Sequence, residues 1–152
     1  MAQGNRMATF LGTFQHTIDH KGRVSLPTKF RKFLTVDAED ALIITRGLDG
    51  CLYGFPDVEW IKIQDRLQAL PLTQQNNRLF VRLLASNAVA VSVDPQGRIP
   101  VPKPLISLAA IETQVLFIGA VNHFEIWSPP VYESYLNQSG QTFEAVAETI
   151  FL

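Results

Sequence analysis

Apolar and polar positions alternate along two stretches of the chain that are nearly the same. Residues 14–27 (FQHTIDHKGRVSLP) and 89–102 (VAVSVDPQGRIPVP) align without gaps at an offset of 75 residues, 14 against 89. Aspartate, glycine, arginine and proline are identical in the two copies, and the apolar positions between them keep their character. Alternation indicates strands, and Asp-x-x-Gly between alternating runs indicates a hairpin turn. Each copy is therefore predicted to form a strand, a tight turn and a second strand that ends at proline.

Two further apolar runs follow each copy at matching distances. They correspond as 43–47 with 115–119 and 52–55 with 124–127, at an offset of 72. The runs at 42–45 and 115–118 are continuous and rich in β-branched residues, which favours strands buried on both faces. Because one unit of about 45 residues has little core of its own, two units are expected to pair into one β-barrel.

Helical spacing appears between the two copies. Apolar residues recur every three or four positions, with two acids in the first turn; they are Trp60, Ile63, Leu67 and Leu70, with Asp57 and Glu59. Pro71 ends this helix. Thr73 is expected to cap a second helix with Phe80 on its apolar face, in which Arg78 and Arg82 project together.

The chain ends in two more helical patterns. A short helix is predicted from Pro129 or Pro130 to Leu136. After a Ser-Gly pair, apolar residues return at helical spacing, and this last segment is either a docked helix or a frayed tail. The residues concerned are Phe143, Val146 and Ile150.

Composition fits a globular chain, and charge is distributed unevenly along it. The 152 residues are 47% hydrophobic and 18% charged, and the net charge of -1 alone argues against a nucleic-acid-binding protein. Yet residues 1–36 hold six basic residues and one acid (+5), whereas residues from 104 onward hold five glutamates and no Lys or Arg (-5). This asymmetry points to an anionic partner at the basic end, with a solvated basic face as the alternative.

The sequence gives little support for catalysis or metal binding. His16 and His20 are four apart but fall on a strand and a turn, where that spacing does not suit a metal. Cys51, the single cysteine, has the environment of a small buried apolar residue. No signal peptide and no run of 18 apolar residues is present. We therefore expect a cytoplasmic protein without catalytic residues, metal, cofactor or membrane partner.

Asp19 and Asp94 occupy equivalent positions, as the two halves of a shared-proton carboxylate pair do. That enzymatic alternative needs small neighbours, whereas each aspartate has an arginine four residues on. A structural turn is the expected role, with each aspartate accepting hydrogen bonds from the following backbone amides. In the second copy this turn comprises Asp94, Gly97 and Arg98.

Five cations occur within twelve residues of the first copy without an acid; they are Lys21, Arg23, Lys29, Arg31 and Lys32. On a hairpin tip and the short helix after it, they are expected to form one exposed basic ridge. A β-ribbon with projecting arginine enters the major groove, where arginine pairs with guanine and lysine contacts phosphate. A solvated face remains the alternative.

Together these residues closely resemble the MraZ family of bacterial transcriptional regulators over about 10–136. The motifs that carry the resemblance are Phe14, His16, Asp19, Lys21, Gly22, Arg23, Pro27, Lys29, Phe30 and Arg31, then Leu52, Pro56, Trp60, Arg78 and Arg82, and finally Asp94, Gly97, Arg98 and the run 125–128. The resemblance implies a mainly β fold with helices (α+β). Two tandem AbrB-like swapped-hairpin units would form one pseudo-twofold, double-psi-like β-barrel.

The implied organisation has four parts: a first AbrB-like unit at 13–60, a helical connection at 61–87, a second unit at 88–131, and a C-terminal helix and tail at 132–152. As function, the resemblance implies a nucleoid-associated, ring-shaped homo-oligomer. It would bind double-stranded DNA at tandem direct repeats in the promoter of the division and cell-wall gene cluster that includes its own gene, as a repressor. The implied DNA-binding residues are Lys21, Gly22, Arg23, Lys29, Arg31 and Arg46.

The second unit departs from the family pattern. It has Leu105-Ile106 where the family has arginine after the leucine of the short helix, and its cations are Arg98 and Lys103. A structural role is therefore expected for Arg98. Two other classes remain open: an antitoxin-type module that covers a partner protein, and a double-barrel enzyme built on the aspartate pair.

Overall fold

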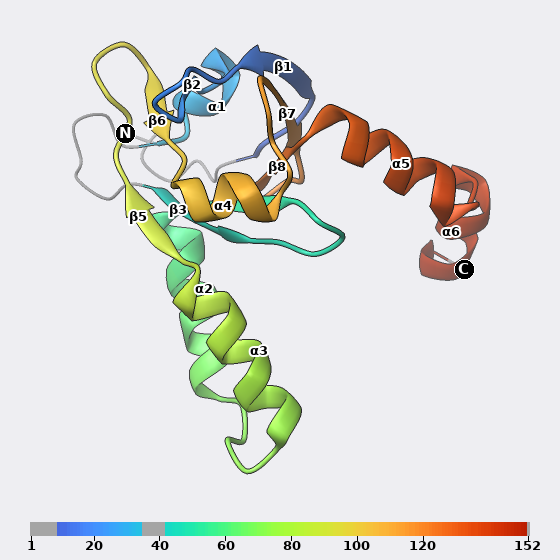
Figure 1. The fold of residues 1–152 in the computed structure, drawn as a ribbon. Helices are drawn as coiled ribbons and strands as arrows, with labels where there is room; N and C mark the ends of the chain where they lie inside the picture. The colour runs from blue at the N-terminus through green and yellow to red at the C-terminus, as the bar shows by residue number, and fades with distance from the viewer. Residues whose placement is uncertain (1–8, 35–41, 152) are drawn as a thin grey trace, which may run out of the picture.

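The computed structural model describes residues 9–34 and 42–151, in an α+β fold of antiparallel strands and helices (Figure 1). Arg6, which was counted in the basic end, lies outside the described residues. In chain order the elements are β1 (Thr13–Thr17), β2 (Arg23–Ser25), α1 (Thr28–Arg31), β3 (Leu42–Arg46), β4 (Leu52–Pro56), α2 (Asp57–Gln68), α3 (Gln75–Ser86), β5 (Val89–Val91), β6 (Arg98–Pro100), α4 (Lys103–Leu108), β7 (Gln114–Gly119), β8 (Phe124–Trp127), α5 (Pro129–Ser139) and α6 (Phe143–Phe151).

Strands of the two repeats interleave in one six-stranded antiparallel sheet of order β1-β7-β8-β4-β3-β5. The first strand of each repeat pairs with the other repeat: β1 with β7, and β5 with β3. β2 and β6 pair only with each other, in a separate two-stranded ribbon. Neither repeat therefore completes its sheet without the other.

The register of the central pairs has pseudo-twofold symmetry. In the β2–β6 ribbon Val24 lies opposite Ile99, its own counterpart in the repeat, and in the β4–β8 pair Tyr53 lies opposite its counterpart Glu125. Hydrogen bonds follow the same symmetry. The Leu26 N–H donates to the carbonyl of Gly97 (2.9 Å), and the Val101 N–H donates to the carbonyl of Gly22 (2.7 Å). Exchanging the two repeats leaves these contacts unchanged.

Two expectations about the strands are wrong. The strands flanking each Asp-x-x-Gly turn were expected to pair as a hairpin. Beside the first turn that pairing is limited to the bridge between Ile18 and Val24 and the Asp19 N–H bond to the Arg23 carbonyl (2.9 Å), while β1 and β2 pair along their lengths with β7 and β6. Each finds a longer or better-matched partner in the other repeat, which local sequence cannot reveal. The described strands also form no closed barrel, because β1 and β5 end the six-stranded sheet with one neighbour each and β2 and β6 pair apart from it.

The core is centred on aromatic rings between the sheet and α1. Phe30 of α1 is fully buried, stacks on Phe124 at 5.2 Å and meets the edge of Phe10 at 5.2 Å. The apolar runs of β3 and β7 are covered less evenly than expected. Ile43, Leu116 and Ile118 are only half-buried, so one face of these strands is fully packed and the other is partly open.

Helices α2 and α3 form a long hairpin that projects from the sheet (Figure 1). α2 has the predicted apolar spacing and its two acids in the first turn. The expected cap of α3 is wrong: the helix begins after Gln74, whose side chain makes no cap bond. Instead Arg78, in the first turn of α3, stabilises the loop before the helix: its guanidinium donates to the carbonyls of Leu72 (2.9 Å) and Thr73 (3.2 Å).

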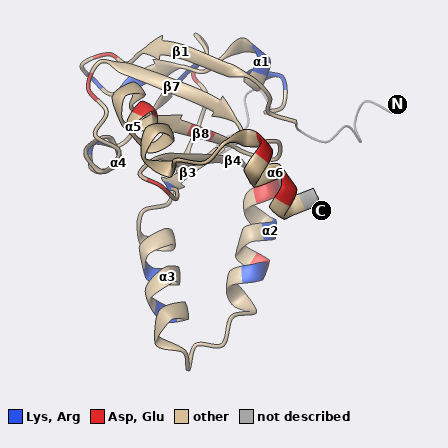
Figure 2. Ribbon diagram, turned by 90° about the vertical axis from the view of Figure 1, so that its right-hand side faces the viewer, with Lys and Arg blue, Asp and Glu red and all other residues tan. Residues whose placement is uncertain are grey.

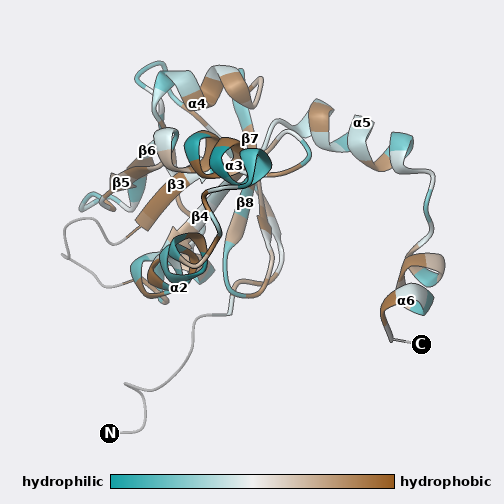
Figure 3. Ribbon diagram, turned by 90° about the horizontal axis from the view of Figure 1, so that it is seen from below, coloured by the Kyte–Doolittle hydropathy of each residue, from teal (hydrophilic) through white to brown (hydrophobic). Residues whose placement is uncertain are grey.

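The C-terminal arm, defined as α5 and α6, extends away from the sheet (Figures 1 and 3). α5 runs three residues beyond the predicted Leu136 and ends at Gly140, whose φ of 63° lies in the left-handed region that glycine adopts readily. α6 is helical, yet its Phe143 side chain is 84% exposed. The last segment is therefore a helix that does not dock on the described part of its own chain.

Candidate nucleic-acid interface

The first tip, residues 19–23, is held by one aspartate. The Asp19 carboxylate accepts hydrogen bonds through Oδ1 from the backbone N–H groups of Lys21 and Arg23, both at 2.9 Å. Through Oδ2 it accepts a third from Arg23 Nε, also at 2.9 Å. Gly22, with φ of 80°, closes the turn. One carboxylate thus fixes both the turn and the side chain that follows it.

The second tip, residues 94–98, repeats this geometry. Asp94 Oδ1 accepts from the N–H groups of Gln96 (2.9 Å) and Arg98 (2.8 Å), and Oδ2 accepts from Arg98 Nε at 3.0 Å. Gly97 also has φ of 80°. Because β2 and β6 pair about the pseudo-twofold axis, the ribbon carries two equivalent tips, one at each repeat.

These hydrogen bonds lower the pKa of both carboxyl groups. For Asp19 the largest cause is the backbone N–H of Arg23, and for Asp94 it is that of Arg98; the arginine side chain adds to the effect in each tip. A carboxylate pair that shares a proton would instead have one raised pKa. Both aspartates are charged at neutral pH and each is paired with its own arginine, which argues against the carboxylate-pair alternative.

Each tip is also packed by the helix of the opposite repeat. A Cβ at Gly97 would collide with the guanidinium of Arg31, and a Cβ at Gly22 would meet Ile106 Cδ1 at 3.3 Å. Arg31 and Ile106 are equivalent in the repeat, 31 and 106 at the offset of 75. The loss of arginine from the second helix therefore places an apolar side chain against the first tip.

The expected basic ridge is divided by this packing. Lys21 and Lys29 are exposed, whereas Arg31 is half-buried, donates through Nε to the Leu26 carbonyl (2.8 Å) and lies at the second tip. Lys32 Nζ lies 5.2 Å from the centre of the Phe33 ring. Thus the five cations do not form one row, because Arg31 serves the other repeat's turn.

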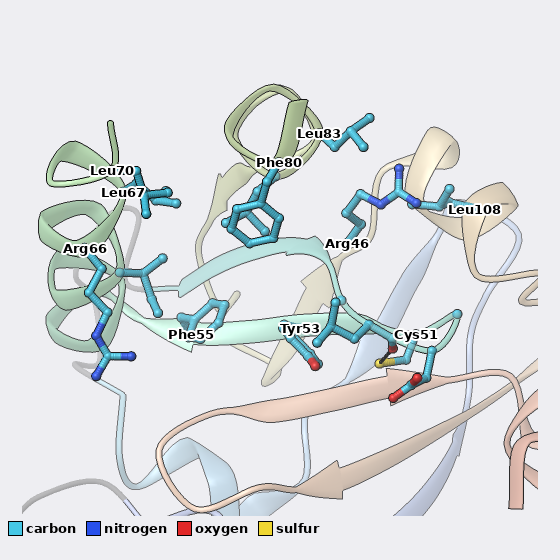
Figure 4. A pocket seen from close by; sticks show the side chains of 16 residues that line it. Arg46, Cys51, Tyr53, Phe55, Arg66, Leu67, Leu70, Phe80, Leu83 and Leu108 are labelled. Carbon is cyan, nitrogen blue, oxygen red and sulfur yellow. Dashed lines mark hydrogen bonds between the residues drawn. The ribbon is translucent and has the colours of Figure 1, made fainter. Parts of the chain in front are cut away.

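Two further predicted DNA-binding residues present no side chain at the tips. Gly22 is buried, and its carbonyl is bonded across the ribbon, so its visible role is in the turn. Arg46 ends β3 and lines a hollow between α2, α3 and the β3–β4 turn (Figure 4). Arg46 was predicted from the resemblance alone, which does not show that β3 directs its last residue to this hollow.

The remaining chemically active side chains are structural. His16 Nδ1 hydrogen-bonds to the Ser25 carbonyl. Burial raises the pKa of the Cys51 thiol far above its usual range. Within residues 9–34 and 42–150, no three His, Cys, Asp or Glu side chains gather in a way that could hold a metal. None of the described helices is long and apolar enough to cross a membrane.

The fold and the tips define a class: proteins built from two intertwined copies of one β unit, which share a ribbon with an aspartate-held arginine at each tip. A family model described as "MraZ protein, putative antitoxin-like" matches residues 9–83 and again residues 84–152. The chain therefore belongs to the MraZ family of transcriptional regulators and carries two copies of its repeat. This is a family of regulators and not of enzymes, as the sequence predicted.

Similar proteins cover nearly the whole chain. A "Transcriptional regulator MraZ" from Ligilactobacillus salivarius (strain UCC118) is 41% identical over 141 residues, which are 93% of this chain and 96% of the relative. A second protein of that name, from Limosilactobacillus reuteri (strain DSM 20016), is 41% identical over 140 residues, or 92% of this chain and 96% of the relative.

Proposed function

We propose that the chain represses transcription by binding double-stranded promoter DNA through its tip surface, defined as Lys21, Arg23, Lys29 and Arg98. The observation that carries the proposal is the aspartate-held arginine. Within the Arg23 side chain only Nε donates to Asp19, and among the described contacts both terminal NH₂ groups of that arginine are without a partner. Those groups are the ones that pair with guanine O6 and N7 in the major groove.

Ordering of the Arg23 side chain before DNA binds favours base recognition. A free arginine side chain loses about 2 kcal/mol of rotamer entropy when it is fixed, and Asp19 has already removed part of that freedom. The exposed ammonium groups of Lys21 and Lys29 suit phosphate contacts, which position the protein and carry no sequence information. In this proposal Arg23 reads bases and the lysines supply most of the salt-dependent affinity.

Self-association completes the proposal. One subunit has four cations in its tip surface and a net charge of -1, so a single subunit is expected to bind DNA weakly. A ring of subunits would present its tips to tandem direct repeats, and affinity would come from multivalency. The resemblance points to repeats in the promoter of the division and cell-wall gene cluster, including the protein's own gene, and to a cytoplasmic, nucleoid-associated location.

The first test compares two arginine substitutions with the same change in charge. Arg23→Ala is expected to weaken binding to the DNA upstream of the protein's own gene by about 5- to 150-fold, the equivalent of about 1–3 kcal/mol. Arg82→Ala, an exposed arginine on α3, is expected to leave the affinity within about twofold. Fluorescence anisotropy at one fixed salt concentration measures both.

Salt titration separates the roles of the tip residues. Lys21→Ala is expected to reduce the slope of log K against log[salt] by about one unit and to weaken all DNA sequences alike. Arg23→Ala with parental affinity would refute the assignment of base reading to Arg23. A parent protein that ignores its upstream DNA even at low salt would refute DNA binding itself and favour the protein-binding alternative.

A further inference from the structure

A hollow of about 610 Å³ opens between the projecting helices and the sheet (Figure 4). Its walls are Ile63 and Leu67 of α2, Leu70 just after that helix, and Phe80 and Leu83 of α3. Phe80 and Leu83 are exposed although they lie on the apolar face of α3. At its base α3 is fixed to the sheet, because Thr45 Oγ1 donates to the Leu84 carbonyl at 2.8 Å. The hollow is therefore an apolar groove with a firm base, and no part of residues 9–34 or 42–151 occupies it.

The side chains that line this groove are net positive: Arg46 and Arg66 line it, and Asp49 is the acid among the lining residues. Figure 2 shows Lys and Arg on α3 and charges of both signs on α2. A ligand that suits both the walls and the rim has an apolar face and carries acids.

The last helix has that character. Its apolar residues fall at i, i+3, i+4 and i+7, which is the pattern of a helix that binds in a groove; they are Phe143, Val146, Ala147 and Ile150. Phe143 is 84% and Ile150 is 68% exposed. Glu144 and Glu148 lie beside this stripe, and the chain has no Lys or Arg after Lys103. This exposed apolar stripe, bordered by acids, is not covered by any described part of its own chain.

The chain's own groove is out of reach of α6 in this arrangement. Only residues 140–142 join α5 to α6, and α5 begins packed on the sheet, with the Tyr132 and Tyr135 rings at 4.9 and 5.4 Å from Trp127. Figures 1 and 3 show the arm leaving the sheet in a different direction from α2 and α3. The arm is placed to reach a neighbouring molecule.

We propose that α6 of one copy of this chain docks in the groove between α2 and α3 of a second copy. The apolar stripe of α6 covers Phe80, Leu83 and Leu67, and its glutamates face the arginines at the rim. Donor and acceptor surfaces differ, so the contact is head-to-tail and continues from copy to copy until the assembly closes. The inference rests on the self-association in the proposed function and names the surfaces that make it.

Light scattering coupled to gel filtration tests the arm. Phe143→Glu is expected to reduce the mass of the parent oligomer to that of the 17.0 kDa chain. Ala145→Glu adds the same charge on the opposite face of α6 and is expected to keep the parental mass. Ile150→Glu is a second variant on the apolar stripe. All three positions are exposed, and circular dichroism is expected to be parental in each.

A mixing experiment tests the groove. Phe80→Glu removes the acceptor surface and is expected to be monomeric by itself. Mixed with Phe143→Glu, it supplies an intact arm to an intact groove, so the pair is expected to form a 1:1 dimer that grows no further. A mixture that stays monomeric would refute the contact.

The oligomer masses also distinguish failure of this contact from failure of the proposed function. Parental mass in both Phe143→Glu and Ile150→Glu, with a parent that is oligomeric and binds DNA, refutes this contact and leaves the proposed function standing. A monomeric parent whose mass no variant changes, as expected if α6 folds into its own groove, refutes both the contact and the self-association. Loss of DNA binding in Arg23→Ala with parental mass shows that the tips and the arm act separately, as proposed.

Discussion

Gly22 and Gly97 show how single residues hold the two tips. Both have φ of 80°, a left-handed conformation that costs a residue with a side chain about 1 kcal/mol or more. At Gly22 a Cβ would also lie 2.9 Å from the Val101 carbonyl oxygen. Val101 belongs to the opposite repeat, and its backbone N–H donates to the Gly22 carbonyl. The glycine is thus required by turn geometry and by contact between the repeats.

Gly22→Ala is expected to cost about 2–4 kcal/mol, the sum of the conformational cost and of a contact that cannot relax. Gly140→Ala is the matched control. Gly140 also has positive φ, 63°, but nothing lies within 4 Å of its Cβ position, so its cost is at most about 1 kcal/mol. Urea unfolding measures both. Equal losses would contradict the role of the Val101 contact.

At the residue scale, the Asp-x-x-Gly-Arg pattern in the sequence predicted a turn, and the structure has the expected aspartate bonds to the backbone amides. It did not predict the position of Arg31, which packs on Gly97 of the other repeat. The two features differ in the sequence separation of the residues that determine them. A bond from Asp19 to Arg23 spans four residues, whereas the position of Arg31 depends on how two distant strands pair.

At the element scale, α1 illustrates how a short helix depends on burial. Its four residues make too few internal hydrogen bonds to be stable alone. Phe30 supplies the missing stability, since its ring lies among Phe10, Phe14, Phe117 and Phe124. The helix that carries Lys29 therefore exists because of one aromatic anchor.

Phe30→Ala is expected to cost about 3–5 kcal/mol, through lost burial and the cavity left behind. Leu105→Ala, at the equivalent position of α4, is expected to cost about 2–5 kcal/mol because Leu105 is also buried. Lys29→Ala, on the exposed side of α1, is the control and is expected to change stability by less than about 0.5 kcal/mol. Chemical denaturation compares the three. A loss below 1 kcal/mol in Phe30→Ala would contradict the anchor.

Elements differ in how far the sequence predicts them. Helix α2 follows directly from apolar spacing, because the period of 3.6 residues is local. The start of α3 does not, since the Arg78 side chain hydrogen-bonds to the carbonyls of Leu72 and Thr73, and Thr73 does not cap the helix as expected. Strand partners were also mistaken, because every run of alternating residues offers the same edge to several others.

At the scale of the whole molecule, the chain separates two kinds of surface. The tip surface carries half-buried arginines on the β2–β6 ribbon and exposed lysines in the first turn and on α1, while the C-terminal arm carries acids and an apolar stripe (Figure 2). The net charge of -1 is near zero because the +5 of residues 1–36 cancels the -5 of residues 104–152. A regulator that assembles through one surface and binds DNA through the other needs no strongly basic subunit.

This separation predicts how assembly contributes to affinity. The parent is expected to bind DNA with tandem repeats about 100-fold or more tightly than DNA with one repeat. Phe143→Glu is expected to bind both DNAs with the weak single-repeat affinity, whereas Arg23→Ala is expected to weaken both and to weaken the tandem DNA more, because every engaged tip loses the same interaction. Anisotropy titrations on matched DNAs measure this. A Phe143→Glu variant that retains the tandem advantage would contradict the link between arm and avidity.

The sequence by itself determined the repeat, the two turns, the principal helices and the family, because each depends on residues that are close in the chain or on direct similarity. Only the tertiary structure decided which strands pair across the repeats, where Arg31 and Arg46 lie, and that the described residues leave both an apolar groove and an apolar arm uncovered. The physical reason is that turns and helices are stabilised over three or four residues. Strand pairing and exposed surface depend instead on contacts between residues tens of positions apart, among several partners of similar pattern.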